Sequence, residues 1–192
     1  MTRASASGRR RPHPVVAAAV CVVLLLVAAG LVRHLVVRPF EVPSASMEPV
    51  LRSGDVILAD RGERGSARRG EIVVFDGTGY FAPTADGGDR YWVKRVIAVG
   101  GDRVECCDPS GSLLLDGEPL PEPYLPAGTA PSTIEFDLEV PEGRMFVLGD
   151  NRADSTDSRH LLGAPGGGMI PVERVVGEVD RIVWPWPRRA AL

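Results

Sequence analysis

The one lysine of this sequence is its most informative candidate for chemistry. Lys94 is the only lysine among 22 basic side chains, so arginine occupies the other 21 positions (22 − 1 = 21). An arginine keeps its proton at any accessible pH, whereas a lysine removed from water can lose its proton and act as a base. Lys94 lies in the apolar run over residues 91–99, which predicts a β-strand.

Strand alternation would place Arg95 on one face of this run and Lys94 on the other, together with Trp92, Val96 and Ala98. We therefore expect apolar neighbours to lower the pKa of Lys94. A chance lysine at the margin of a sheet is the alternative interpretation.

Two serines between prolines form the second candidate. Ser44 and Ser46 lie between Pro43 and Pro49, and in an extended segment residues i and i+2 share one side. A serine is a weak nucleophile until a neighbouring base accepts its proton. A neutral, buried lysine amine is such a base, so the sequence favours Ser-Lys chemistry.

A histidine base is the alternative. Of the three histidines, His13 lies in the basic tail and His34 at the edge of the apolar run, so His160 is the only one well inside the exported part of the chain. A triad of a serine, His160 and either Asp154 or Asp157 is conceivable, but both carboxylates lie beside His160 in one dense polar loop.

The N-terminal region predicts that the candidate serines and lysine are anchored to a membrane. Residues 15–32 are eighteen apolar positions without a charge, long enough for one membrane-spanning helix. Four arginines precede this run and no acidic residue occurs before Glu41, so the positive-inside rule predicts a cytoplasmic basic tail over residues 1–14 and an extracytoplasmic domain over residues 33–192. A removable signal peptide is the alternative, because Ala28, Ala29 and Gly30 are small, but the apolar run continues to Val32.

The chain beyond Arg38 is acidic. Six basic residues lie at or before Arg38, which leaves 22 − 6 = 16 basic side chains against all 25 acidic ones and a net charge of 16 − 25 = −9. This balance disfavours nucleic acid as a partner. Roughly 150 residues suffice for one compact domain, with or without a small appendage.

The three cysteines predict neither a disulfide framework nor a metal site. Cys21 lies in the predicted span, and Cys106 and Cys107 are adjacent. A vicinal disulfide, two separate contacts and no role at all are open alternatives for the pair, and we favour a structural role over a redox role.

Short apolar stretches separated by turn residues predict a mainly antiparallel β domain. Strands are expected at residues 56–59, 72–75, 91–99, 113–115, 145–148, 175–179 and 182–184, with a hairpin turn at Asp116 and Gly117. No long helix is expected beyond the apolar N-terminal run. Residues 76–90 and 108–143 are rich in turn residues and are predicted as surface loops or a cap, with a small cap or insertion at about residues 104–143.

Four motifs in this order resemble those of the type I signal peptidases, also called leader peptidases. Residues 43–49, Pro-Ser-Ala-Ser-Met-Glu-Pro, resemble the nucleophile box PSxSMxPTL, and residues 69–75 resemble the strand that follows. Lys94-Arg95 with the Gly-Gly-Asp of residues 100–102 resembles the lysine box, and residues 149–159 resemble GDNRxxSxDSR. The similarity extends from Phe40 to Trp184.

The resemblance implies a membrane-anchored serine endopeptidase that removes signal peptides from exported preproteins and uses no metal or other cofactor. It implies Ser46 as the nucleophile, Lys94 as the general base and Ser44 as an oxyanion-hole donor. It further implies that Ser155 hydrogen-bonds the Lys94 amine. The ion-pair set that braces the site would be Asp150, Arg95, Asp157 and Arg159. Membrane lipid and signal-peptide-bearing preproteins are the implied partners, with small residues preferred at the first and third positions before the cut.

Three departures from the family pattern affect the surroundings of the site. Val50 replaces a usual threonine, Ala153-Asp154 replaces Asp-Asn, and residues 160–163 replace an aromatic-glycine ending. These changes leave open the fine hydrogen bonding around Ser46 and Ser155. The interval from Lys94 to Gly149 is also short for the family, which implies a reduced second domain.

Two rival functions remain. A Ser-Lys peptidase of the self-cleaving repressor type is disfavoured by the predicted span. A non-catalytic, membrane-anchored β domain that binds exported proteins would make the lone lysine and the paired serines coincidental. Phe40, Trp184 and Trp186 are candidates for contacts at the membrane–water boundary, and a place in the core is an equal alternative for the two tryptophans.

Overall fold

The computed structural model describes residues 14–81, 90–164 and 166–192. It divides into two units, Met1–Val36 and Val37–Leu192, and the helix α1 (Pro14–Val36) belongs to the first. In the described part of the chain, no helix is long and apolar enough to cross a membrane. The span over residues 15–32 remains a prediction, and the predicted basic tail falls, up to residue 13, outside the described residues.

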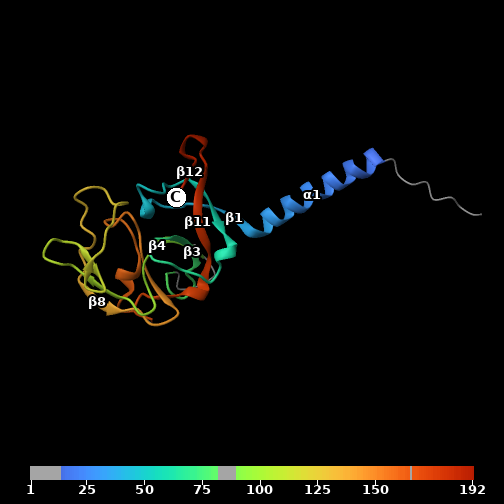
Figure 1. Ribbon diagram of the computed structural model, residues 1–192. Coiled ribbons are helices and arrows are strands. Elements are labelled where there is room, and N and C mark those ends of the chain that lie inside the picture. The colour runs from blue at the N-terminus through green and yellow to red at the C-terminus, as the bar shows by residue number, and fades with distance from the viewer. Residues whose placement is uncertain (1–13, 82–89, 165) are drawn as a thin grey trace, which may run out of the picture. The chain divides into compact units, whose positions relative to one another are not determined.

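The larger of two sheets positions the predicted chemistry. Its strands follow the order β1-β2-β11-β3-β4-β9-β10, and β12 pairs with β11 (Figure 1). All of these pairings are antiparallel. The strands are β1 (Val37–Glu41), β2 (Val56–Asp60), β3 (Ile72–Asp76), β4 (Tyr91–Val99), β9 (Arg144–Leu148), β10 (Ile170–Pro171), β11 (Val175–Trp184) and β12 (Ala190–Ala191). The prediction of a mainly antiparallel β fold is confirmed.

A smaller sheet has the order β7-β6-β5-β8. It comprises β5 (Arg103–Cys106), β6 (Leu113–Leu115), β7 (Glu118–Pro119) and β8 (Phe136–Glu139). Figure 1 shows β8 at the left of the view, apart from β3 and β11 of the larger sheet. The predicted hairpin is confirmed: β6 and β7 pair around Asp116 and Gly117, whose φ angles of 55° and 84° lie in the left-handed region that two-residue hairpin turns require.

Short helical turns complete the structure. Beyond α1, the described residues contain only 3-10 helices, as the absence of a helical pattern predicted. They are η1 (Ala45–Met47), η2 (Arg61–Glu63), η3 (Ser158–Leu161), η4 (Val172–Arg174) and η5 (Trp186–Arg188).

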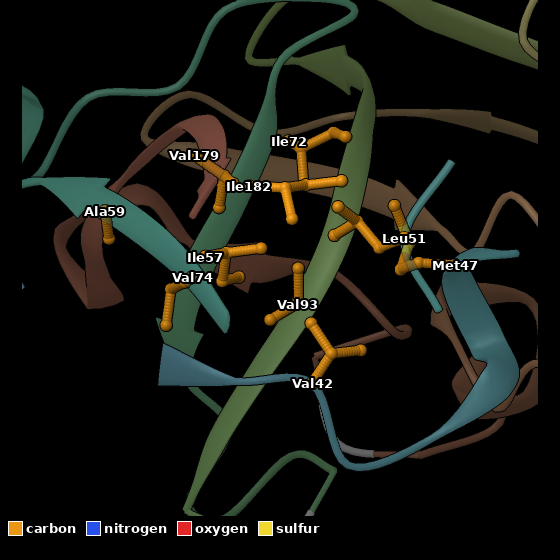
Figure 2. Close-up of a cluster of buried hydrophobic side chains, with 10 residues drawn as sticks. All are labelled: Val42, Met47, Leu51, Ile57, Ala59, Ile72, Val74, Val93, Val179 and Ile182. Atoms are coloured by element: carbon orange, nitrogen blue, oxygen red, sulfur yellow. The ribbon is translucent and has the colours of Figure 1, made fainter. Parts of the chain in front are cut away.

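A buried apolar cluster attaches the two serines to the larger sheet. Met47 and Leu51 are fully buried in a cluster with side chains from β2, β3, β4 and β11. Figure 2 shows the members of this cluster, among them Val93, the neighbour of Lys94 on β4. Because burying a side chain of this size contributes about 1.5–3 kcal/mol, the chain on either side of Ser46 is held against the strand that carries the lysine.

The prediction that residues 108–143 are loop rather than core is wrong in part. Leu113, Phe136 and Val140 are buried and share a cluster with Ile97 and Phe146 of the larger sheet. The sequence predicts the strand at residues 113–115 but not β5, β7 or β8, because short strands between glycine- and proline-rich turns have too few residues to change the local composition.

Two further corrections concern strand regularity. The separate strands expected at residues 175–179 and 182–184 are one strand, β11, with a register shift between Val179 and Arg181. In β4, Trp92 and Val96 contribute to one cluster as expected, but a register shift between Val96 and Ala98 places Ala98 in another. A bulge reverses the alternation of side chains, which a strict period of two cannot anticipate.

The exposed fractions of the two tryptophans show whether they lie in the core or at the surface. Trp184 is 59% exposed and Trp186 is 69% exposed, so the alternative that places them in the core is wrong. Phe40 is half-buried and packs edge-on against Tyr91, with ring centroids 5.4 Å apart.

Cys106 and Cys107 form a disulfide at the end of β5. A crosslink between neighbouring residues closes almost no loop, so it restricts the unfolded chain little. Replacing both cysteines by serine should therefore lower the melting temperature by only a few degrees, equivalent to about 1 kcal/mol. Thermal unfolding followed by circular dichroism, with the unsubstituted protein as control, checks this. A fall of more than about 10 °C would contradict it.

Candidate active site

Lys94 lies in the middle of β4, where Val73 of β3 is its partner in the ladder. Its side chain is 2% exposed, and its Nζ lies 2.6 Å from Ser46 Oγ. Burial lowers the pKa of Lys94 to about 8, although the nearby carboxylates of Asp157 and Asp150 oppose this shift. The neutral form of this amine is therefore far more populated near physiological pH than that of an exposed lysine, and the downward shift of the pKa agrees with the prediction.

Ser46 lies in the 3-10 turn η1, which begins after Ser44. Ser44 has extended backbone angles (φ −142°, ψ 167°), so the expectation that both serines belong to one extended segment is wrong for Ser46. The hydroxyl oxygens of the two residues are nevertheless 3.3 Å apart. The 3-10 turn, rather than an extended segment, thus brings the two hydroxyls together. It also directs the Ser46 hydroxyl toward Lys94.

Asn151 donates two hydrogen bonds to the turn η1, which contains Ser46. The Asn151 amide N–H donates to the carbonyl oxygen of Ser46 at 3.0 Å, and Asn151 Nδ2 donates to that of Ala45 at 3.1 Å. Sequence reasoning assigned no role to Asn151, although it belongs to a recognised motif. The only sign of this role in the sequence is that Asn151 is a polar residue of that motif to which no chemical role is assigned.

Gly149 allows the close approach of these segments. A Cβ atom at this position would overlap both Ser155 Oγ and the carbonyl oxygen of Ser46. The position therefore requires glycine because of close packing.

The expected hydrogen bond between Ser155 and the Lys94 amine is not present among the described residues. Ser155 is buried, and its Oγ makes no hydrogen bond of good geometry there, although its proximity to Asp157 helps to lower the pKa of that carboxyl. The side chain instead packs against Gly149. Ser155 thus belongs to the site by position, but its expected contact requires correction.

Arg95 and Asp150 form a bidentate ion pair, with N–O distances of 2.8 and 2.7 Å. Arg95 also donates to the Gly70 carbonyl oxygen at 2.7 Å, and its guanidinium lies 3.9 Å from the ring centroid of Tyr124. Burial raises the pKa of Asp150, and the hydrogen bonds from Arg95 oppose that effect. The pair joins β4 to the segment that holds Ser46.

Asp157 and Arg159 form a second buried pair, with two N–O distances of 2.8 Å. Asp157 also accepts a hydrogen bond from the Gly149 amide at 3.1 Å. Burial alone would raise the pKa of Asp157, but the hydrogen bonds from Arg159 and Gly149 outweigh it and lower the pKa. The four residues of the predicted ion-pair set thus form two pairs, and both carboxylates lie near enough to Lys94 to affect its pKa.

A third buried pair was not anticipated. Arg152 is paired with Glu122, and it donates to the carbonyl oxygens of Gly149 and Pro131, each at 3.0 Å. It connects the segment before β8 to the turn at residues 149–151. No sequence pattern marks Glu122 as its partner.

His160 does not meet the serines. It is exposed, its Nδ1 lies 3.6 Å from Asp157 Oδ1, and it completes the cap of η3. The titratable side chain that the structure brings to Ser46 is that of Lys94.

The Lys94–Ser46 contact opens into a hollow of about 310 Å³. It is lined by residues 42–47 and 91–94, with Asp154 and Thr156 at its other wall. Within the described residues, no group of three or more His, Cys, Asp or Glu side chains is placed to hold a metal ion. A hydroxyl beside a partly neutral amine, at a hollow of this size, is suited to acyl transfer on a peptide.

Known proteins resemble this chain over most of its length. The model of the family described as signal peptidase, peptidase S26, matches residues 15–184. Signal peptidase I of Mycobacterium tuberculosis is 36% identical over 211 residues, which cover 87% of this chain and 71% of that protein. Signal peptidase I of Bacillus caldolyticus is 35% identical, with 95% of this chain and 94% of that protein covered.

A solved structure is also similar. The crystal structure of a signal peptidase I from Enterococcus faecalis is 28% identical, with 59% of this chain and 96% of that chain covered and a TM-score of 0.43. Because the family model matches most of the chain and relatives above 30% identity are covered over most of their length, the chain belongs to the signal peptidase family, peptidase S26.

Proposed function

We propose that Ser46 and Lys94 are the catalytic dyad with which this signal peptidase I cleaves signal peptides from secreted preproteins. The single observation that supports this assignment is the 2.6 Å contact between Lys94 Nζ and Ser46 Oγ, made by an amine that is 2% exposed. A non-catalytic binding domain has no need of a desolvated amine beside a hydroxyl, because burying it costs stability.

The mechanism follows from this contact. The neutral Lys94 amine accepts the hydroxyl proton as Ser46 Oγ attacks the scissile carbonyl carbon. The resulting ammonium gives the proton to the leaving amine as the peptide bond breaks, which leaves an acyl ester on Ser46. Water, deprotonated by the same amine, then hydrolyses the ester. No step needs a metal or other cofactor.

Ser44 is proposed as an oxyanion-hole donor. Its hydroxyl lies 3.3 Å from Ser46 Oγ, close to where the carbonyl oxygen of a bound substrate would develop charge. Loss of one such donor costs about 10²–10³ in rate. Ser44 therefore contributes less than either member of the dyad.

The buried ion pairs are proposed to position the dyad. Arg95 with Asp150 holds the segment at residue 150 against β4, whereas Asp157 with Arg159, together with the hydrogen bond from the Gly149 amide to Asp157, fixes the conformation of residues 149–159 themselves. Ser155 supports the same arrangement by packing against Gly149.

We propose a membrane-anchored organisation for the whole chain. Residues 1–14 form a cytoplasmic tail, residues 15–32 span the cell membrane once, and residues 33–192 form the extracytoplasmic catalytic domain, with a small insertion at about residues 104–143. The arginines before the apolar run support this topology, as do the exposed Trp184 and Trp186, since tryptophan is favoured at the membrane–water boundary.

Lys94→Arg tests the base. It should lower single-turnover cleavage of a preprotein by about 10²–10⁴-fold, because a guanidinium keeps its proton and cannot accept that of Ser46. Ser46→Ala should cause a loss at least as large. Ser110→Ala, which removes an exposed hydroxyl that contacts Asp108 and Ser112 away from the hollow at Ser46, is the matched control and should retain full activity. Activity of Lys94→Arg within about tenfold of wild type would exclude the dyad.

The pH dependence tests the protonation state. With a pKa of about 8, about one tenth of Lys94 is neutral one pH unit below that value. The kcat/KM should therefore rise about tenfold from pH 7 to a plateau above pH 9. His160→Gln should show the same profile. A flat profile over this range, or one abolished by His160→Gln, would disprove the titrating lysine.

Deletion of residues 1–36 tests the topology. Every strand in the described residues begins at or after Val37, so the domain should fold and cleave a short soluble peptide at an undiminished rate. Cleavage of a membrane-embedded preprotein should slow, because Ser46 follows Val32 by 46 − 32 = 14 residues, at most about 50 Å of chain. The measurement is the ratio of the two kcat/KM values. An unchanged ratio would show that tethering does not assist substrate capture.

A further inference from the structure

A second hollow, of about 380 Å³, is lined mainly by arginines. We call it the arginine hollow, and its arginines are Arg38, Arg61, Arg64, Arg90 and Arg174. Two carboxylates, Asp76 and Glu173, also line it, so the side chains carry 5 − 2 = +3 charges. This is a concentration of positive charge in a domain whose net charge beyond Arg38 is 16 − 25 = −9.

Asp76, one of the two carboxylates of the hollow, is already paired with arginines. Asp76 pairs with Arg90 at 2.7 Å and lies 3.8 Å from Arg174 Nη1. Burial would raise the pKa of Asp76, but hydrogen bonds from Thr78 and Arg90 lower it to about 2, so the carboxylate is ionised at neutral pH. Its single charge is shared between two guanidinium groups.

Two of the arginines have no such partner. In the described part of the chain, the side chains of Arg61 and Arg64 make no hydrogen bond or ion pair. Arg38 lies over aromatic rings instead, with its guanidinium carbon 4.8 Å from the centroids of Phe40 and Tyr91. Like charges gathered in one hollow repel one another, and an anion bound among them would remove that repulsion.

The geometry of guanidinium groups selects the anion. A guanidinium presents a planar fork of N–H donors that matches the oxygens of phosphate, and several can share one phosphate group. We propose that the arginine hollow binds a phosphate group, either that of an anionic lipid headgroup or free phosphate, through Arg61 and Arg64.

The lipid source rests on the proposed topology. Arg38 follows Val32 by 38 − 32 = 6 residues, at most about 22 Å of extended chain. If residues 15–32 span a bilayer, this tether keeps Arg38 within reach of the headgroup layer.

The experiment uses the full chain in neutral detergent micelles. Isothermal titration measures binding of inorganic phosphate at constant ionic strength, and separately of short-chain phosphatidylglycerol and phosphatidylcholine. The test variant is R61Q/R64Q. The matched control is R52Q/R181Q, which removes the same charge from two exposed arginines outside the hollow.

Wild type and R52Q/R181Q should bind phosphate or phosphatidylglycerol saturably, and R61Q/R64Q should bind at least about tenfold more weakly. Binding of phosphatidylglycerol, with weaker binding of phosphatidylcholine and phosphate, identifies the headgroup as the source. If inorganic phosphate binds at least as tightly as phosphatidylglycerol, free phosphate is the source. Equal affinity of the two double variants, or no saturable binding up to about 10 mM ligand, overturns the proposal.

Cleavage of a soluble peptide separates this result from the proposed catalytic function. Arg61 and Arg64 lie outside the hollow at Ser46, so R61Q/R64Q should cleave at the wild-type rate. That rate also shows that the variant is folded. A loss of binding with intact cleavage supports the arginine hollow independently of the dyad.

Discussion

The removal of one amine from water is the constraint on which the structure depends. Burial lowers the pKa of Lys94 from its ordinary 10.5 to about 8, a cost of about 3 kcal/mol to the folded state wherever the amine would otherwise be protonated. Because the unfolded chain binds this proton more tightly, that cost falls as pH rises from about 8 to 10.5. The fold tolerates the cost because β4 lies between β3 and β9 and is packed on both faces.

The buried ion pairs set the limit of this effect. Asp150 and Asp157 attract a proton to Lys94, whereas desolvation repels it, and desolvation is the larger effect. Each carboxylate is engaged by its own arginine, which reduces its influence on the lysine. Buried ion pairs contribute little net stability compared with apolar packing. Their value here is positional, since Arg95–Asp150 joins β4 to the segment that contacts the turn of Ser46 and Asp157–Arg159 fixes the conformation of that segment.

The two hollows meet at one aromatic ring. Tyr91 lines both the hollow at Ser46 and the arginine hollow. The guanidinium carbons of Arg38 and Arg90 lie 4.8 and 5.4 Å from the centroid of this ring. Tyr91 is the first residue of β4, the strand that carries Lys94. A phosphate group in the arginine hollow would thus bind next to Arg38 and Arg90, which contact the Tyr91 ring.

The sequence by itself determined the antiparallel β class, six of the twelve described strands, the hairpin at Asp116 and the identity of the lysine, because composition and alternation are local properties. The tertiary structure alone decided the contacts between distant residues. Lys94 and Ser46 are 48 positions apart, and Asn151 and Ala45 are 106 apart. Strand order and bulges decide which of these residues meet, and no local periodicity encodes them. For this reason the Arg152–Glu122 pair, the unpartnered Ser155 hydroxyl and the arginine hollow emerged only from the fold.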